Sequence, residues 1–254
     1  MYSIDLTGKV AVVTGGSEGL GYSIADALCQ ASANVVITGR RAQLLEDAAV
    51  RLRQRYPDVK ILALPSDASR IVDIRQMATE VESTFGKIDI LVNNAGTNIP
   101  KVALEVTEED WDLVMDVNLK GVFFCCQEIG RRMVRQQSGR IINIASQMGL
   151  VGYYKRAAYC ASKGGVVQFT KVLAIEWARD NVQVNAVGPT FTETPLARAV
   201  LSEPSVAEEI LQRIPMGKLA QPEDVAGAVL YLSSDLANFV TGHTLLVDGG
   251  WVAW

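Results

Sequence analysis

The sequence is poor in the residues that build metal centres and histidine-dependent catalytic sites. Its 254 residues contain one histidine, His243, and four cysteines without a Cys-x-x-Cys spacing. A zinc or iron site needs several such ligands, and a Ser-His-Asp triad needs a histidine of its own. We therefore interpret His243 as a structural residue near the last strand, and we expect no metal site.

An excess of positive charge is also missing, and so is any long apolar run. Lysine and arginine number 24 against 28 aspartates and glutamates, which gives a net charge of −4 and does not favour nucleic acid as a partner. No apolar run approaches the ~20 residues of a membrane-spanning helix. The N-terminus lacks the charged and apolar regions of a secretory signal. The four cysteines are expected to be reduced, as in a cytoplasmic protein without a membrane partner.

Short β-branched runs alternate along the chain with amphipathic segments of helical period. Strands are predicted at Lys9–Thr14, Asn34–Thr38, Lys60–Leu64, Ile88–Val92, Arg140–Ile144, Val182–Val187 and Thr244–Val247. Helices are predicted at Leu20–Ala31, Ala42–Tyr56, Ile71–Phe85, Glu108–Arg135, Tyr154–Arg179 and Pro222–Ser233. This order predicts an α/β fold, namely a single doubly wound (Rossmann) domain over residues 1–254. It would contain a seven-stranded parallel sheet with helices on both faces.

A proline-bearing segment at about residues 188–216 interrupts this regular alternation. It is expected to be an insertion that follows the sixth strand. It would serve either as a substrate-binding lid or as a plain surface connection.

A glycine-rich turn follows the first predicted strand and opens the first predicted helix. The segment Thr14–Gly21 has the spacing Gly-x-x-x-Gly-x-Gly, at the place where a doubly wound fold binds a dinucleotide. Glycine lets the backbone approach a pyrophosphate, and the helix N-terminus offers free N–H groups. The candidate contacts in this turn are Gly15, Ser17, Gly19, Leu20 and Gly21.

The end of the second predicted strand carries no carboxylate to hold a ribose 2′-hydroxyl. Arg40 and Arg41 stand there instead, and guanidinium groups suit a 2′-phosphate. We therefore expect NADP(H) to be preferred, with NAD(H) still possible. Glu18 opposes this preference because it adds negative charge to the turn. Alternatively, both arginines merely flank a solvated helix.

Tyr159 and Lys163 are four residues apart in a predicted helix and therefore share one of its faces. A cation about 4 Å from a phenol supplies roughly 4 kcal/mol at an effective dielectric of about 20. That is enough to bring a tyrosine pKa from about 10 to about 7. Most such pairs lie on ordinary helix surfaces, so the rest of the sequence decides whether this one is catalytic.

Further motifs occur in a fixed order along the chain. Asn93–Gly96 ends the fourth predicted strand, Asn118 lies within Val117–Gly121, and Ser146 follows the fifth predicted strand. Together with the glycine-rich turn and the Tyr159/Lys163 pair, these motifs resemble the short-chain dehydrogenase/reductase family over essentially the whole chain.

The resemblance implies a role for each matching residue. Tyr159 would be the general acid/base, and Ser146 would bind and polarise the substrate oxygen. Lys163 would bind the nicotinamide ribose and lower the pKa of Tyr159, while Asn118 would hold a proton-relay water. Further cofactor contacts are implied at Asp67, Ala68, Asn94, Ala95, Gly96, Pro189, Thr190 and Thr192. Taken singly, Asn118, Asp67 and Ser146 would each suit a structural role.

One position departs from the family pattern. Thr190 follows Pro189 where a glycine is usual, which leaves the geometry of that loop in doubt.

These residues predict an NAD(P)(H)-dependent oxidoreductase that transfers hydride between nicotinamide and a secondary alcohol or ketone. The segments Arg156–Lys163 and Val247–Trp251 resemble those of family members that act on gluconate, other keto sugars or polyols. The candidate substrate-lining residues are Gln147, Met148, Tyr153, Tyr154, Thr190, Thr192 and Leu196. A 3-oxoacyl thioester reductase is the alternative enzyme, and a non-catalytic nucleotide sensor is the alternative of another class.

A homotetramer is expected from the resemblance. The apolar segments Phe239–Val240 and Trp251–Trp254 are predicted to form subunit contacts.

Overall fold

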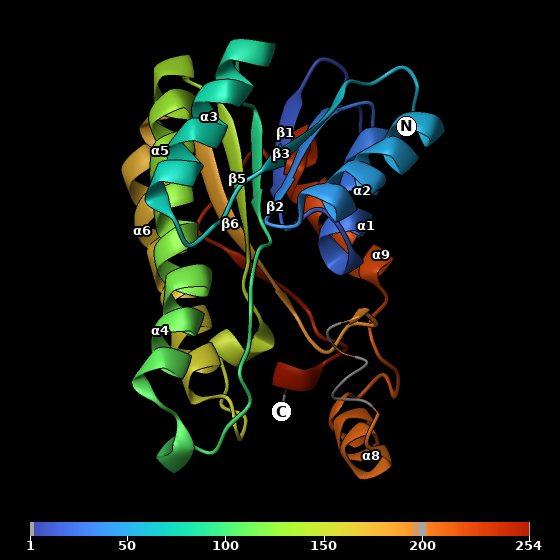
Figure 1. Ribbon diagram of the computed structural model, residues 1–254, viewed down its shortest axis with the longest axis vertical. Helices are drawn as coiled ribbons and strands as arrows, with labels where there is room; N and C mark the ends of the chain where they lie inside the picture. Colours follow the sequence, from blue (N-terminus) through green and yellow to red (C-terminus); the bar gives the residue numbers. More distant parts are fainter. Residues whose placement is uncertain (1–2, 196, 198–201, 254) are drawn as a thin grey trace.

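The protein folds around one parallel β-sheet. The computed structural model describes residues 3–195, 197 and 202–253. Its seven-stranded sheet has the order β3-β2-β1-β4-β5-β6-β7, and the predicted fold class is confirmed (Figure 1). The strands are β1 (Val10–Thr14), β2 (Asn34–Gly39), β3 (Ile61–Pro65), β4 (Ile90–Asn93), β5 (Gly139–Ile144), β6 (Val182–Pro189) and β7 (Thr244–Val247).

Helices cover both faces of the sheet. On one face lie α1 (Gly19–Gln30), α2 (Ala42–Arg55) and α9 (Pro222–Ser233), which share a core with the sheet. On the other face lie α3 (Ile71–Phe85), α5 (Val122–Gln136) and α6 (Ala157–Trp177), with a second core. Figure 1 shows these two groups on opposite sides of the strands.

The central strand β1 determines where along the sheet a ligand-binding site is expected. All five of its residues are buried, as expected for a strand with helices on both faces. Val12 pairs with Val36 of β2 on one side and with Leu91 of β4 on the other. The chain therefore winds outward in one direction to β3 and then in the other direction from β4. A doubly wound fold binds its ligand at this switch point, beyond the carboxyl ends of the strands.

The long helix predicted at Glu108–Arg135 is two helices. Its first part is α4 (Glu108–Met115), and a π-helical turn over Asp116–Gly121 separates α4 from α5. The wider turn contains the fully buried Asn118, whose side chain bonds the backbone of Thr97. Sequence periodicity missed the break because a π turn inserts one residue while the helix continues, and Gly121 alone does not signal a helix end.

The proline-bearing segment contains a helix that the sequence analysis did not predict. This helix, α8 (Pro204–Arg213), has Pro204 in its first turn. A proline there costs no hydrogen bond, and its fixed φ angle favours helix initiation. Leu196, a predicted substrate-lining residue, lies outside the described residues.

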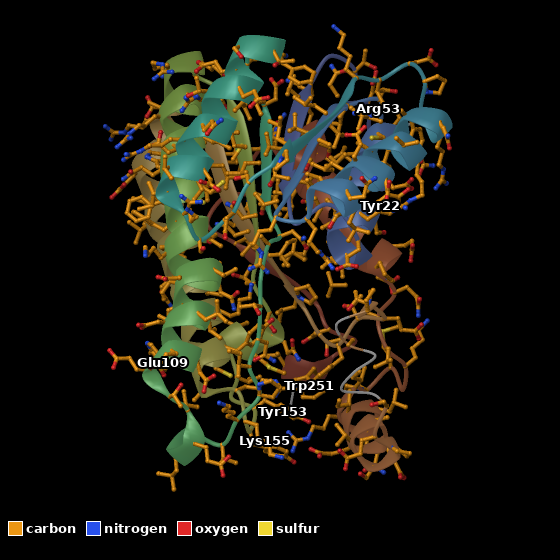
Figure 2. All side chains as sticks on the ribbon, in the orientation of Figure 1. Tyr22, Arg53, Glu109, Tyr153, Lys155 and Trp251 are labelled. Atoms are coloured by element: carbon orange, nitrogen blue, oxygen red, sulfur yellow. The ribbon has the colours of Figure 1, made fainter. Side chains whose placement is uncertain are left out.

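Aromatic side chains join α8 to the C-terminal segment. The ring of Tyr153 lies 5.8 Å from that of Trp251, and the Arg213 guanidinium lies over both rings. Figure 1 shows α8 and the C-terminus at the same end of the molecule, and Figure 2 places Tyr153 and Trp251 there. Trp251 is thus buried within its own chain, which corrects its predicted role in a subunit contact. Trp254 lies outside the described residues.

The glycine-rich turn is packed so closely that one added methyl group would clash with its neighbours. A Cβ atom on Gly21 would lie 2.1 Å from the Gly15 carbonyl oxygen and 2.5 Å from Asn94 Nδ2. We expect Gly21→Ala to lower the free energy of unfolding by about 1–3 kcal/mol, because the backbone must move. Urea denaturation measures this change.

A matched control is Gly227→Ala in α9, where no atom lies within 4 Å of the added Cβ. There we expect stabilisation of up to about 1 kcal/mol, because alanine favours a helix over glycine. Equal effects of the two substitutions would contradict the close packing of the turn.

Candidate active site

A cavity of about 610 Å³ lies at the carboxyl edge of the sheet. The structure brings together in its wall every residue that the sequence analysis assigned to the cofactor. These are Gly15, Ser17, Gly19, Leu20, Gly21, Arg40, Arg41, Asp67, Ala68, Asn94, Ala95, Gly96, Tyr159, Lys163, Pro189, Thr190 and Thr192. Ser146 lines the same cavity, so three of the four predicted catalytic residues face it.

The glycine-rich turn leaves the N-terminus of α1 open toward an anion. Glu18 occupies the N-cap position without a side-chain capping bond, and the first turn of α1 has no acidic residue. Gly15 and Gly19 adopt φ angles of 67° and 55°, which favour glycine. The first N–H groups of α1 are therefore available to a pyrophosphate. These features fit a dinucleotide.

The two arginines after β2 have different surroundings. Arg41 donates a hydrogen bond to the Glu18 carboxylate and forms an ion pair with it. Arg40 forms no ion pair within the described part of the chain, although its charge acts on Asp67. Burial works to raise the pKa of Asp67, but hydrogen bonds from Ser69 outweigh burial, and the pKa lies below its usual value. Arg40 is thus the freer guanidinium at this part of the cavity.

Lys163 holds a buried ammonium beside Tyr159. Only 4% of the residue is exposed, and Nζ donates a 2.7 Å hydrogen bond to the carbonyl oxygen of Ile144 at the end of β5. Nζ lies 5.7 Å from the centroid of the Tyr159 ring. Burial lowers the pKa of Lys163 to about 8. The predicted proximity of the pair is therefore observed.

The ionisation of Tyr159 differs from the sequence-based expectation. Burial raises the pKa of its phenol, while a hydrogen bond with Ser146 and the charge of Arg156 partly oppose that shift. In the cofactor-free protein, the Lys163 ammonium donates its hydrogen bond to the Ile144 carbonyl. It does not lower the pKa of the Tyr159 phenol toward 7. Desolvation of the phenol, which disfavours its charged form, is thus the larger effect.

Ser146 is placed by the turn that follows β5. Its hydroxyl accepts a hydrogen bond from the Met148 backbone N–H at 3.1 Å and donates one to Gln147 Oε1 at 2.8 Å. Gln147 in turn donates to the Thr190 hydroxyl at 3.4 Å. Thr190 has no positive φ angle, and its N–H bonds the Val247 carbonyl at 3.1 Å. The threonine in place of the usual glycine is therefore unstrained.

Asn118 does not line the cavity, but its side chain binds the backbone of Thr97, which does. Its side-chain oxygen accepts a hydrogen bond from the Thr97 N–H, and its Nδ2 donates to the Thr97 carbonyl, both at 2.8 Å. Nδ2 also lies 3.3 Å from the Ser162 hydroxyl. The side-chain amide thus fixes the loop that follows β4.

The remaining substrate predictions divide into two groups. Gln147, Met148, Thr190 and Thr192 line the cavity. Tyr153 and Tyr154 are not in its wall and stack on each other with ring centroids 4.7 Å apart. The sequence analysis assigned no role to Phe191 or Arg156, which both line the cavity. Arg156 precedes Tyr159 by about one helical turn, but its burial was not visible in the sequence.

The buried ammonium predicts a pH dependence of stability. The folded pKa of Lys163, about 8, is below its unfolded value of about 10.4. Between these values the unfolded chain binds more protons, so the folded state gains stability as the pH rises. Relative to Lys163→Met, we expect the free energy of unfolding of the cofactor-free wild type to rise by about 2 kcal/mol from pH 7 to 9.5.

Urea denaturation at the two pH values measures this difference. Lys171→Met is the control, because Lys171 lies exposed on the same helix and its substitution should give the same difference at both pH values. A difference for Lys163→Met that stays constant with pH would contradict a buried, destabilised ammonium.

Metal ligands and membrane-spanning helices are the remaining features to consider. Within residues 3–195, 197 and 202–253, no three His, Cys, Asp or Glu side chains gather as potential metal ligands. Over the same residues, none of the helices combines the length and apolarity needed to cross a bilayer.

Comparison with known proteins agrees with the geometry of the cavity. A family profile described as enoyl-(acyl carrier protein) reductase matches residues 15–252. An NAD-dependent glycerol dehydrogenase of Listeria innocua is 39% identical over 97% of this chain and 95% of its own. A 3-oxoacyl-(acyl-carrier-protein) reductase of Aquifex aeolicus is 40% identical over 97% and 98%.

A solved structure has the same fold. The crystal structure of a gluconate 5-dehydrogenase from Burkholderia cenocepacia, in complex with NADP and tartrate, is 34% identical to this chain. It covers 99% of this chain and 98% of its own, with a TM-score of 0.95. The chain therefore belongs to the short-chain dehydrogenase/reductase family and is a nicotinamide-dependent oxidoreductase.

Proposed function

We propose that this enzyme uses NADP(H) to interconvert a secondary alcohol and a ketone on a small polar substrate, such as a sugar acid or a polyol. The observation that carries the proposal is the grouping of Ser146, Tyr159 and Lys163 in one cavity with the open N-terminus of α1. Ser146 and Tyr159 line the same cavity, and the Ser146 hydroxyl acts on the Tyr159 phenol, so we place both hydroxyls on one substrate oxygen. The similarity to a gluconate 5-dehydrogenase supports the substrate class.

The mechanism assigns one task to each side chain. In the reducing direction, Tyr159 gives its phenolic proton to the substrate oxygen, and in oxidation it takes that proton back. Ser146, whose hydroxyl donates to Gln147 Oε1 in the substrate-free protein, would redirect that hydrogen bond to the same oxygen and stabilise its developing charge. Lys163 binds the ribose hydroxyls and stabilises the phenolate of Tyr159. The bound nicotinamide accepts or supplies the hydride.

Asn118 is proposed to assist by holding Thr97 and its loop beside Lys163. The relay water that the family resemblance implies would rest on neighbouring backbone atoms. The side-chain amide of Asn118 is already occupied by Thr97 and Ser162.

Removal of the Tyr159 hydroxyl tests the acid/base assignment. We expect Tyr159→Phe to lower kcat by at least ~10²-fold, because no other group replaces the proton donor. The Kd for NADPH, followed by protein fluorescence, should stay within about threefold. Tyr231→Phe in α9 serves as the control, because Tyr231 packs against the core and does not line the cavity. Full activity of Tyr159→Phe would refute the role.

The surroundings of the arginines support a preference for NADP(H). The negative charge of Glu18, which opposed that preference, is paired with Arg41. Arg40 lines the cavity and forms no ion pair among the described residues, so its guanidinium is available to the 2′-phosphate.

Substitution of Arg40 tests this preference. We expect Arg40→Ser to weaken NADPH binding by about 10–100-fold, because a charge-assisted hydrogen bond is lost. NADH binding should change by less than about threefold. Arg41→Ser should have a smaller effect on NADPH, since its charge is already paired. Titration of each variant with both cofactors measures the four constants, and tighter binding of NADH by the wild type would contradict the assignment.

Reduction of a 3-oxoacyl thioester is the second candidate activity. The 40% identity to an acyl-carrier-protein reductase favours it. NADPH oxidation with acetoacetyl thioester, compared with keto sugars at equal concentration, separates the two by kcat/KM. A non-catalytic sensor is disfavoured because Ser146, Tyr159 and Lys163 are all present and face the cavity.

The assembly and location proposed for this enzyme are a homotetramer in the cytoplasm. Phe239 is fully exposed on the single chain, as is Leu104, and apolar side chains of this size favour burial between subunits. Cys29, Cys125, Cys126 and Cys160 are all free thiols, which suits a reducing compartment.

A further inference from the structure

Arg156 is a buried cation in the cavity wall without an anionic partner. Only 7% of the residue is exposed, and it lines the same cavity as Tyr159. Its recorded hydrogen bond joins Nη1 to the backbone carbonyl of Lys155 at 3.1 Å. Over the described residues it forms no ion pair. A guanidinium has five N–H donors, so most of its bonding capacity is left for a ligand.

Among the residues that the structure describes, no carboxylate forms an ion pair with Arg156. The titratable groups that act on it are Tyr153, Tyr159 and Cys160. The carboxylate of Asp110 forms its ion pair with Lys101, with Nζ 2.5 Å from Oδ2, and not with Arg156. Burial lowers the pKa of Arg156, and the nearby Tyr153, Tyr159 and Cys160 offset that shift only in part. A buried charge is costly unless it is paired, and the chain as a whole is acidic, with a net charge of −4.

The backbone holds Arg156 at a fixed place beside the reacting groups. It forms an isolated parallel bridge with Lys101, and its carbonyl accepts the first helical bond from Cys160 N–H at 2.8 Å. Arg156 therefore marks the start of α6, whose first turn contains no acidic residue. The helix N-terminus adds positive potential at the same place. Tyr159 follows within about one helical turn.

We propose that Arg156 binds the carboxylate of the substrate and makes this enzyme selective for hydroxy acids and keto acids over neutral polyols. The inference rests on the proposed alcohol–ketone oxidoreductase function and specifies its substrate class. The planar guanidinium and a carboxylate match in a bidentate geometry. The bound acid would supply the anion that the protein itself lacks at this position.

The test uses pairs of substrates that differ only in charge. The wild-type enzyme with NADP⁺ is assayed on d-gluconate and d-gluconamide, and on 3-hydroxybutyrate and its amide. For any pair that is oxidised, we expect kcat/KM to be at least about 10-fold higher for the acid. In Arg156→Gln, KM for the acid should rise about 10–100-fold, while the constants for the amide stay within about threefold.

Two further variants separate recognition from structure. Arg156→Lys should retain part of the acid preference, because it keeps the charge but not the planar fork. Lys155→Gln removes the same charge from the adjacent residue, which is exposed and does not line the cavity. It should retain the wild-type preference. If Arg156 only maintained the fold, Arg156→Gln would slow acid and amide equally, and that result would overturn the proposal.

The outcomes distinguish the failure of the subsite from that of the reaction. Oxidation of amides and acids at equal kcat/KM by the wild type would leave the oxidoreductase function intact and overturn the carboxylate site. If no pair is oxidised, calorimetric titration of the NADP⁺ complex with d-gluconate decides the matter. Binding that Arg156→Gln weakens at least about 10-fold supports the site without the proposed reaction. Absence of binding overturns both.

Discussion

The hydroxyl of Thr14 links the ends of the paired strands β1 and β4, where the two halves of the doubly wound sheet meet. Its oxygen accepts hydrogen bonds from the backbone N–H groups of Asn94 and Ala95, each at 3.0 Å. Asn94 returns the contact through Nδ2, which donates to the carbonyl oxygens of Thr14 and Gly15. The ends of β1 and β4 are therefore fixed to each other. Without these bonds, the N–H groups of the partly buried residues Asn94 and Ala95 would lose their partners.

From this junction the contacts continue to Lys163, the lysine proposed to act in catalysis. Asn118 holds Thr97, three residues beyond Asn94, and also contacts Ser162, which precedes Lys163. Lys163 reaches back to the Ile144 carbonyl, which ends β5. The loops after β1, β4 and β5 thus form one hydrogen-bonded framework. The turn proposed to bind the dinucleotide and the proposed acid/base pair are far apart in the sequence but share this framework, so a shift in one would displace the other.

The charges in the cavity are arranged at a cost in stability. Lys163 is buried against a carbonyl oxygen rather than a carboxylate, and Arg156 is buried without any counter-ion among the described residues. Both groups are desolvated, which destabilises the folded chain on its own. An anionic ligand recovers part of that cost on binding, because its attraction to a cation is stronger in a dry cavity than in water. The protein is acidic overall, so its unpaired cations make the cavity a more favourable place for an anionic ligand than the outer surface of the protein.

Local patterns in the sequence were sufficient for the fold class and for most of the site. Apolar runs such as Val10–Val13 specify buried parallel strands, and the order of strands and helices allows few topologies. The motifs around Gly15, Ser146 and Tyr159 are short, and their residue types are tied to their chemistry.

Other features depend on residues that are distant in the chain. The π-helical turn at Asn118 exists because Thr97 offers it backbone partners, and Pro204 starts a helix that packs near Trp251.

The electrostatics also follow from the fold rather than from the sequence. Sequence spacing placed Lys163 beside Tyr159, but only the packed structure shows that burial raises the pKa of the phenol and lowers that of the ammonium. Arg156 is the same residue type as the more exposed arginines of α2, yet the fold buries it. Residue type and spacing determined the kind of chemistry that this protein performs. Tertiary structure decided which charges are desolvated and unpaired, because desolvation depends on every atom that excludes water from a group.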